Sequence, residues 1–307
     1  MRVLVTGATG YIGRAVLSSL RSSGHDPVAM VRTRRPELSG AGEVRHGDLQ
    51  DPASLAEAMY GVDSVCHLAG LTRARESWAQ PMRYFQVNVG GTLAVLAAAE
   101  TAGVSRLVFA STAAVYGAPD QQPMSEDLPN DPPHPYAASK AAAETAVEWQ
   151  ARSNRLGAVV IRLFNAAGGA DPDPTRIIPR VLAVAAGEQE ALDVNGDGSA
   201  VRDYLHVDDA AAAFVSALER TPSTGSMRRY NIGSGVGTSV TDVVRAAMRV
   251  TGGKIKVVHL PPAAEPEALV CNPALAMAEL GWKPRRSNLD MIVGDAWLAR
   301  STPTSQR

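Results

Sequence analysis

The sequence predicts an α/β protein that consists of a doubly wound parallel sheet and a smaller C-terminal α/β domain. Three observations predict this fold. An aliphatic run at residues 2–6 ends at a glycine turn, and apolar residues at helical spacing follow the turn. Segments with strand and helix patterns then alternate up to about residue 165. Strands that alternate with helices form parallel sheets that are covered on both faces and bind ligands beyond the carboxyl ends of their strands.

Length and composition restrict the class of protein. A chain of 307 residues is long enough for one large domain or two modest ones. A formal charge of −1 favours neither nucleic acid nor an acidic membrane as a partner, so we expect a small molecule. Cys66 and Cys271 lie far apart, which indicates neither a disulfide framework nor a metal site. No run resembles a secretory signal or a membrane span, so we expect a soluble, cytoplasmic protein.

The N-terminal turn has the features of a phosphate-binding loop. Gly7, Gly10 and Gly13 lie between the first strand and the helix that follows it. Glycines let the backbone approach a pyrophosphate closely, and the helix N-terminus presents unpaired N–H groups to it. The spacing is G-x-x-G-x-x-G, which resembles the short-chain dehydrogenase/reductase superfamily and differs from the G-x-G-x-x-G of ordinary dinucleotide enzymes.

The residue after the second strand bears on the choice of cofactor. We expect this strand at residues 27–31, and Arg32 follows it, with Arg34 and Arg35 close behind. An acidic side chain at this place would bind a ribose 2′-hydroxyl, whereas an arginine favours the 2′-phosphate of NADP. A solvated basic loop is an equally good interpretation, so NAD and NADP both remain open.

The third and fourth strands are expected at residues 43–49 and 62–70. The third ends in Asp48, and Asp51 then caps a helix. The fourth runs into a second glycine turn that lines the cofactor cleft. His67, within this strand, has no metal-ligand partner nearby, which favours a packed wall residue over a catalyst.

The remaining segments complete the alternation. A helix at 93–102 and a strand at 106–110 are followed by a sixth strand at 158–164, and Asn165 at its end is a plausible substrate contact. Arg202 has two interpretations, an ordinary surface cation or a diphosphate ligand, and its bidentate guanidinium beside a strand end suits a diphosphate better than a lysine would. Further helices are expected at 175–185, at the alanine-rich segment 207–218, which indicates close packing, and at 238–250, capped by Thr238 or Ser239.

Tyr136 and Lys140 carry the chemistry that the sequence indicates. They are four residues apart on an alanine-rich helix and therefore share one face. A phenol is a poor base at neutral pH, but a lysine ammonium and a cationic nicotinamide nearby would lower its pKa. The phenolate can then accept a hydroxyl proton while hydride leaves the same carbon. A hydroxyl from Thr112 or Ser111 would bind the reacting oxygen.

Four stretches carry a resemblance to a family. Residues 109–117 resemble a Ser/Thr loop whose catalytic hydroxyl falls on Thr112, and residues 162–165 resemble a signature whose asparagine contacts a sugar nucleotide. Residues 201–209 resemble a stretch whose arginine binds the diphosphate, and residues 280–284 resemble the C-terminal ending. Over nearly its whole length the chain resembles the extended short-chain dehydrogenases, and among them the nucleotide-sugar 4-epimerases typified by UDP-glucose 4-epimerase.

This resemblance implies a Rossmann-like fold, NAD as cofactor, a nucleotide-sugar substrate and a homodimer formed through helices within residues 82–102 and 136–152. It also implies a cofactor domain at 1–165 with about 203–235, and a substrate domain at about 166–202 and 236–307. Thr112, Tyr136 and Lys140 would be catalytic. The cofactor would contact Gly7, Thr9, Gly10, Tyr11, Ile12, Gly13, Arg32, Asp48, Leu49, Leu68, Ala69, Gly70, Asn88, Ser111, Tyr136, Lys140 and Phe164. The substrate would contact Thr72, Thr112, Tyr136, Asn165, Ile178, Arg180, Val194 and Arg202.

Two departures qualify the resemblance. The family has a second phosphate-binding arginine before the C-terminal ending, but residues 261–267 contain two glutamates and no arginine. Either Arg180 or another cation substitutes, or the substrate is not a conventional nucleotide diphosphate sugar. Related dehydratases place Asp-Glu after the catalytic threonine, whereas this chain has Ala113 and Ala114, which disfavours elimination of water.

Three functions are therefore weighed. The first is C4 epimerisation of a UDP-hexose through a 4-keto intermediate. The second is NADPH-dependent reduction of a nucleotide-linked ketosugar or another carbonyl substrate, which Arg32 and the missing arginine favour. The third is a non-catalytic NAD(P)-sensing binding protein, which the presence of Thr112, Tyr136 and Lys140 disfavours.

Overall fold

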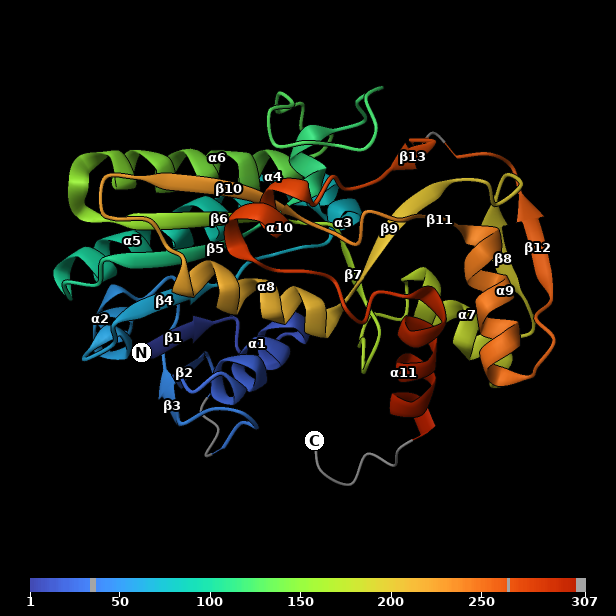
Figure 1. The fold of residues 1–307 in the computed structure, drawn as a ribbon, viewed down its shortest axis with the longest axis horizontal. Helices are drawn as coiled ribbons and strands as arrows, with labels where there is room; N and C mark the ends of the chain where they lie inside the picture. The colour runs from blue at the N-terminus through green and yellow to red at the C-terminus, as the bar shows by residue number, and fades with distance from the viewer. Residues whose placement is uncertain (34–36, 264–265, 302–307) are drawn as a thin grey trace.

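A seven-stranded parallel sheet forms the larger part of the molecule (Figure 1). The structure is a computed structural model and describes residues 1–33, 37–263 and 266–301. The strand order is β10-β6-β5-β4-β1-β2-β3, and every pair in this sheet is parallel, as predicted. The strands are β1 (Arg2–Thr6), β2 (Asp26–Val31), β3 (Glu43–His46), β4 (Ser64–His67), β5 (Arg106–Thr112), β6 (Gly157–Leu163) and β10 (Met227–Ile232).

Helices cover both faces of this sheet (Figure 1). One face packs against α1 (Tyr11–Ser22) and α8 (Val207–Glu219). The other face packs against α2 (Pro52–Met59), α5 (Gly91–Thr101) and α6 (Pro135–Gln150). Each face has its own apolar cluster, so the predicted doubly wound arrangement is confirmed.

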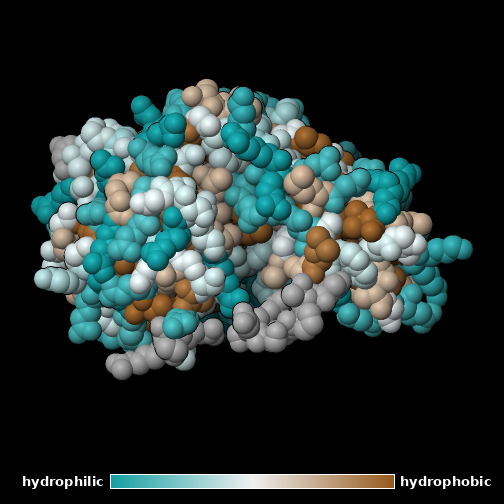
Figure 2. Space-filling view, turned by 60° about the horizontal axis from the view of Figure 1, so that its bottom comes forward, coloured by the Kyte–Doolittle hydropathy of each residue, from teal (hydrophilic) through white to brown (hydrophobic). Residues whose placement is uncertain are grey.

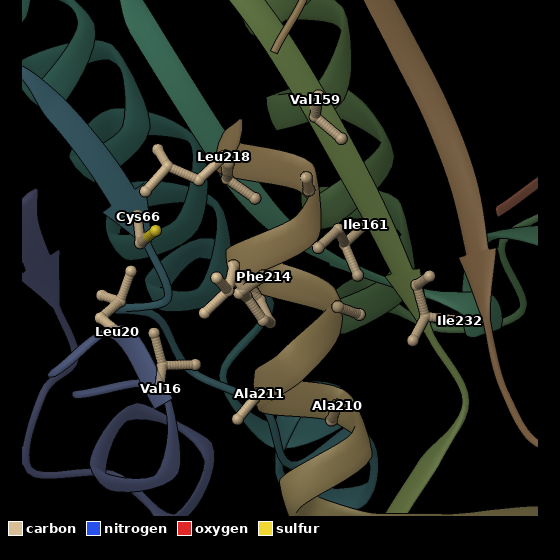
Figure 3. Packing of buried hydrophobic residues seen from close by; sticks show 14 of the residues in the cluster. Val16, Leu20, Cys66, Val159, Ile161, Ala210, Ala211, Phe214, Leu218 and Ile232 are labelled. Carbon is tan, nitrogen blue, oxygen red and sulfur yellow. The ribbon is translucent and has the colours of Figure 1, made fainter. Parts of the chain in front are cut away.

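The alanine-rich helix α8 packs closely on the sheet, as predicted. Its alanines Ala210 and Ala211 are buried in the cluster that also contains Val16 of α1 and Ile161 of β6, and Phe214 lies beside them (Figure 3). Small side chains permit this close approach, and dense packing maximises dispersion contacts. Among the described residues, no helix combines the length and hydropathy that a bilayer span requires.

Some element boundaries differ from the predicted ones. β3 ends at His46, short of the predicted Asp48, because the chain turns there and the Asp48 carboxylate accepts a hydrogen bond from the Gln50 N–H at 2.9 Å. β5 extends to Thr112, two residues beyond the prediction. The predicted caps hold, since the Asp51 carboxylate accepts from N–H groups of α2 and Ser239 forms a capping box at the start of α9 (Val240–Thr251).

A second lobe lies at the right in Figure 1 and has its own apolar cluster. Its helices are α7 (Ile177–Ala185), α9 and α11 (Leu289–Ser301). Its strands are β7 (Asn165–Ala167), β8 (Leu192–Asn195), β9 (Val201–His206), β11 (Gly237–Ser239), β12 (Val257–Leu260) and β13 (Ala268–Leu269). β8 pairs with β12, while β9 pairs with β7, β11 and β13.

The segment 274–282 packs on the large sheet. The helix α10 (Ala274–Leu280) falls within the predicted substrate region 236–307, yet Ala276 and Leu280 lie buried in the cluster that covers the large sheet. Trp282 joins them, and its indole N–H donates to the Asp209 carbonyl in α8 at 2.9 Å. Burial of apolar side chains against α8 and β10 holds this segment on the cofactor side.

The short elements between β4 and β6 complete the fold. They are α3 (Ala74–Ala79), α4 (Pro81–Phe85), π-helical turns at Gln86–Gly90 and Ala151–Arg155, and a 3-10 turn at Ala113–Tyr116. The face in Figure 2 is largely hydrophilic, with hydrophobic residues in small separate groups.

Candidate active site

A cavity of about 890 Å³ lies beyond the carboxyl ends of β1, β2, β4, β5 and β6. Its volume lies at the upper end of the range typical of small-molecule sites. Most residues assigned to cofactor or substrate from the sequence line it: Gly7, Thr9, Gly10, Tyr11, Ile12, Gly13, Arg32, Asp48, Leu49, Leu68, Ala69, Gly70, Thr72, Ser111, Thr112, Tyr136, Lys140, Phe164, Asn165, Ile178 and Arg202.

The glycine turn needs its glycines because the backbone around them is closely packed. A Cβ at Gly13 would lie 2.1 Å from the Gly7 carbonyl oxygen, and one at Gly7 would lie 2.8 Å from the Ala69 nitrogen. Gly7 also has a φ of +69°, which L side chains rarely adopt. The turn therefore packs backbone against backbone, and its glycines line the cavity at the N-terminus of α1, which fits a dinucleotide pyrophosphate.

Buried hydroxyl groups fix the second glycine turn beside the first. The Thr6 hydroxyl accepts hydrogen bonds from the N–H groups of Leu68 and Ala69, each at 3.1 Å. His67 lies between Thr6 and Thr92, with its ring nitrogens 2.7 Å and 3.2 Å from their hydroxyl oxygens. Burial, assisted by the charge of Lys140, lowers the pKa of His67 to about 3. The prediction of a packed wall residue at His67 is confirmed.

Helix α6 presents Tyr136 and Lys140 to the cavity from one face. His134 caps this helix, because its Nδ1 accepts from the Ala137 N–H at 3.1 Å. The His134 ring also stacks on Tyr136, with ring centroids 5.8 Å apart. Lys140 is buried, and its Nζ lies 4.1 Å from the centroid of the Phe109 ring. Contacts within the chain thus hold the first turn of α6.

The pKa of Tyr136 departs from the expected direction. Burial raises the pKa of the phenol, and a hydrogen bond with Thr112 and the charge of Arg176 lower it less. The expected decrease in the pKa of Tyr136 depended partly on the positive charge of an oxidised nicotinamide, which the protein residues alone do not supply. Burial also lowers the pKa of Lys140 to about 7, although the nearby Glu144 carboxylate opposes this. A neutral phenol and a readily titrated amine result.

The structure distinguishes between the two candidate hydroxyls. Thr112 lies at the end of β5, accepts from the Ala114 N–H at 3.2 Å and hydrogen-bonds Tyr136. Ser111 lines the cavity, but its hydroxyl donates to the buried carboxylate of Glu144. That carboxylate also pairs with Arg162 at 2.6 Å, and both side chains are at most 3% exposed. Thr112 is therefore the hydroxyl available to a reacting oxygen.

Asn88, assigned to the cofactor from the sequence, lies behind the cavity wall. It is buried in the π-helical turn, and its amide oxygen accepts from the Leu71 N–H at 2.8 Å. Its amide nitrogen donates to the Leu71 carbonyl at 3.0 Å and to the Ser139 hydroxyl at 2.9 Å. The residue therefore connects the second glycine turn to α6 and does not line the cavity.

Two of the residues assigned to the substrate lie elsewhere. Arg180 extends from α7 to donate to the Asp193 carbonyl at 2.8 Å, and it does not line the cavity. Val194 is buried in the core of the second lobe. Arg202 lines the cavity and donates from Nη1 to the Pro266 carbonyl at 2.9 Å.

Two charged residues in the cavity wall were not identified from the sequence. Arg176 directly precedes α7, and its guanidinium lies 3.2 Å from the carboxylate of Asp171. Asp171 and Arg176 stand in a loop and form no recognisable sequence motif. Only their charge could have marked them as functional residues in the sequence. Among the described residues no group of three His, Cys, Asp or Glu is placed to bind a metal ion.

Arg32, which the sequence links to the choice between NAD and NADP, is part of the cavity wall. It follows β2 and lines the cavity with Gly47 and Asp48. Arg34 and Arg35, also noted from the sequence, lie outside the described residues, as do residues 264 and 265 of the stretch 261–267.

The chain is similar to known proteins over nearly its whole length. The NAD dependent epimerase/dehydratase family model matches residues 3–233. UDP-glucose 4-epimerase of Streptomyces lividans is 38% identical over 96% of this chain and 95% of its own length. The crystal structure of UDP-glucose-4-epimerase from Stenotrophomonas maltophila with bound NAD and formylated UDP-arabinopyranose has a TM-score of 0.91, with 31% identity over 98% of both chains. That of UDP-glucose 4-epimerase from Brucella ovis in complex with NAD has a TM-score of 0.90, with 34% identity over 97% of both chains.

Proposed function

The chain belongs to the NAD dependent epimerase/dehydratase family, and from this premise we propose that it is an NAD-dependent enzyme that epimerises a UDP-hexose at C4. The observation that carries the proposal is the convergence of Thr112, Tyr136 and Lys140 in the cavity that the glycine turn opens. Relatives named UDP-glucose 4-epimerase and neighbours with bound NAD and a UDP-sugar support the same reaction.

The roles of the three residues follow from their positions. NAD, when bound, supplies acceptance and return of a hydride at C4. Tyr136 takes the C4 hydroxyl proton and later returns it to the oxygen of the 4-keto sugar. Thr112, which hydrogen-bonds the phenol, also holds the reacting oxygen. Lys140, one turn along the same helix face, stabilises the phenolate and binds the cofactor ribose.

The reaction is tested by incubating the protein with UDP-galactose and following the sugar anomeric signals by NMR. We expect UDP-glucose to form without net consumption of cofactor. The Tyr136→Phe variant removes the proton acceptor while keeping the ring, and we expect activity to fall by at least a hundredfold. Full activity in this variant contradicts the proposed chemistry.

A second candidate is reduction of a nucleotide-linked ketosugar with NADPH, because Arg32 lies in the cavity wall after β2, where a 2′-phosphate would bind. Stoichiometric oxidation of NADPH with a 4-ketosugar, without epimerisation of UDP-galactose, favours this reductase over the epimerase.

The assembly, compartment and domains are further parts of the proposal. We expect a homodimer because Met82, Leu93 and Trp149 are 68%, 52% and 66% exposed, on or beside the helices expected at the interface. Unpaired Cys66 and Cys271 suit the reducing cytoplasm. We keep the expected domain division, except that the segment 274–282 packs on the large sheet and residues 203–206 of β9 pair with strands of the second lobe. Sedimentation of the purified protein tests the dimer.

A further inference from the structure

We propose that Arg176 binds the diphosphate of the nucleotide sugar together with Arg202. This inference rests on the proposed function, because the diphosphate belongs to the proposed substrate. The family that the chain resembles has a second phosphate-binding arginine before its C-terminal ending. The corresponding stretch here, residues 261–267, contains no basic residue. A diphosphate that leaves water for this cavity needs charge-assisted hydrogen bonds from more than one side.

Two cations of the cavity wall are candidates for binding the diphosphate. The cationic side chains among its described lining residues are Arg32, Lys140, Arg176 and Arg202. Lys140 stands beside the proposed proton acceptor, and Arg32 follows β2 on the cofactor side. Only Arg176 and Arg202 remain on the side formed by the second lobe.

The backbone holds Arg176 at the cavity wall. It directly precedes α7, whose first residues Ile177 and Ile178 also line the cavity. Its guanidinium carbon lies 5.7 Å from the centre of the ring of Tyr11, a residue within the glycine turn. The side chain therefore extends from the second lobe toward the cofactor side of the cleft.

The guanidinium keeps hydrogen-bond donors for a ligand. Its Nη1 lies 3.2 Å from an Asp171 carboxylate oxygen, and its Nε lies 3.9 Å from one of Asp173. Nη2 makes no hydrogen bond within the part of the chain that the structure describes. An arginine has five N–H donors, so these carboxylates orient the group and leave donors for phosphate oxygens. The side chain is also 44% exposed and can be reached from solvent.

The charge of Arg176 reaches the reaction centre. It lowers the pKa of the Tyr136 phenol, although burial raises that pKa more. Arg176 and Tyr136 also line the same cavity. Arg180, the cation first considered for this role, bonds the Asp193 carbonyl outside the cavity.

The test compares Arg176→Gln with Arg249→Gln in the NAD-loaded protein. Arg249 is a similarly exposed arginine of the second lobe that pairs with Asp290, and it does not line the cavity. Titration calorimetry with UDP and with uridine separates phosphate contacts from contacts with the nucleoside. We expect Arg176→Gln to weaken UDP binding roughly tenfold to a hundredfold and to leave uridine binding unchanged. We expect Arg249→Gln to bind both ligands as the unsubstituted protein does.

Each outcome decides the matter. Unchanged UDP binding in Arg176→Gln, an equal loss for UDP and uridine, or an equal loss in Arg249→Gln overturns the inference while the proposed function stands. If the unsubstituted protein neither binds UDP nor epimerises UDP-galactose, the proposed function fails instead. Partial recovery of UDP affinity in Arg176→Lys, which restores charge without the bidentate fork, supports the inference further.

Discussion

Replacing Glu144 with glutamine will destabilise the protein strongly, although the substitution changes almost no volume. The carboxylate accepts from the Ser111 hydroxyl and pairs with Arg162 at 2.6 Å and with Arg229 at 3.4 Å. Glu144 and Arg162 are 2% and 3% exposed, so water cannot solvate the guanidinium once its counter-charge is lost. Removing one partner of a buried pair costs about 3–5 kcal/mol.

Thermal and urea unfolding measure this loss. With an unfolding entropy of about 2.1 cal/mol/K per residue, the expected loss lowers the Tm by about 5–8 °C. Glu148→Gln is the matched control, because Glu148 lies one turn later on α6 and pairs with Arg229 at 2.5 Å and with Arg152 at 2.7 Å. Glu148 is 26% exposed, and such pairs contribute about 0.2–1 kcal/mol. An equal effect of the two substitutions refutes the reasoning.

Three further predictions concern the cavity. Lys140→Met should abolish epimerisation but stabilise the fold, because burial lowers the pKa of Lys140 to about 7. The free-energy penalty of burying the ammonium is fully present below pH 7 and disappears as pH rises toward 10.5, the pKa of an ordinary lysine. Urea unfolding at pH 6 and pH 9 should show the larger gain at pH 6, and a gain independent of pH contradicts this. Gly13→Ala should weaken NAD binding at least tenfold in calorimetry, because its Cβ would lie 2.1 Å from the Gly7 carbonyl oxygen. The control Gly294→Ala on α11 places its Cβ where it meets no packed neighbour within 4 Å, so this variant should bind NAD as the unsubstituted protein does. Arg32→Ala should weaken NADP roughly tenfold and leave NAD unchanged; equal losses would show that the guanidinium does not reach the 2′-phosphate.

Local periodicity was sufficient to predict much of the fold. The strand β1, the glycine turn and α1 follow from adjacent residues, and their pattern depends on little else. The capping of α2 by Asp51 is likewise local. By contrast, the packing of α10 on the sheet depends on the surfaces of α8 and β10, which are far away in the chain. No local pattern carries that information.

The site divides in the same way. The spacing of Tyr136 and Lys140 predicted a shared face because one helix contains both. The choice between Ser111 and Thr112 depended on Glu144, which lies on another element and accepts from the Ser111 hydroxyl. The raised pKa of Tyr136 reflects burial by several elements together. Arg176 had no motif, and only the tertiary structure places it in the cavity wall.

The return of α10 and Trp282 to the sheet means that residues 3–233, which the family model matches, lack part of the apolar cover of the large sheet. A chain cut after residue 233 would keep all seven strands of the large sheet. The cut would remove the Glu279 carboxylate, which accepts a hydrogen bond from the Tyr230 hydroxyl at 2.6 Å. It would also expose apolar side chains of α8 to water. Shortened versions intended for crystallisation or engineering should therefore retain the tail through residue 282, or replace it with a designed cover.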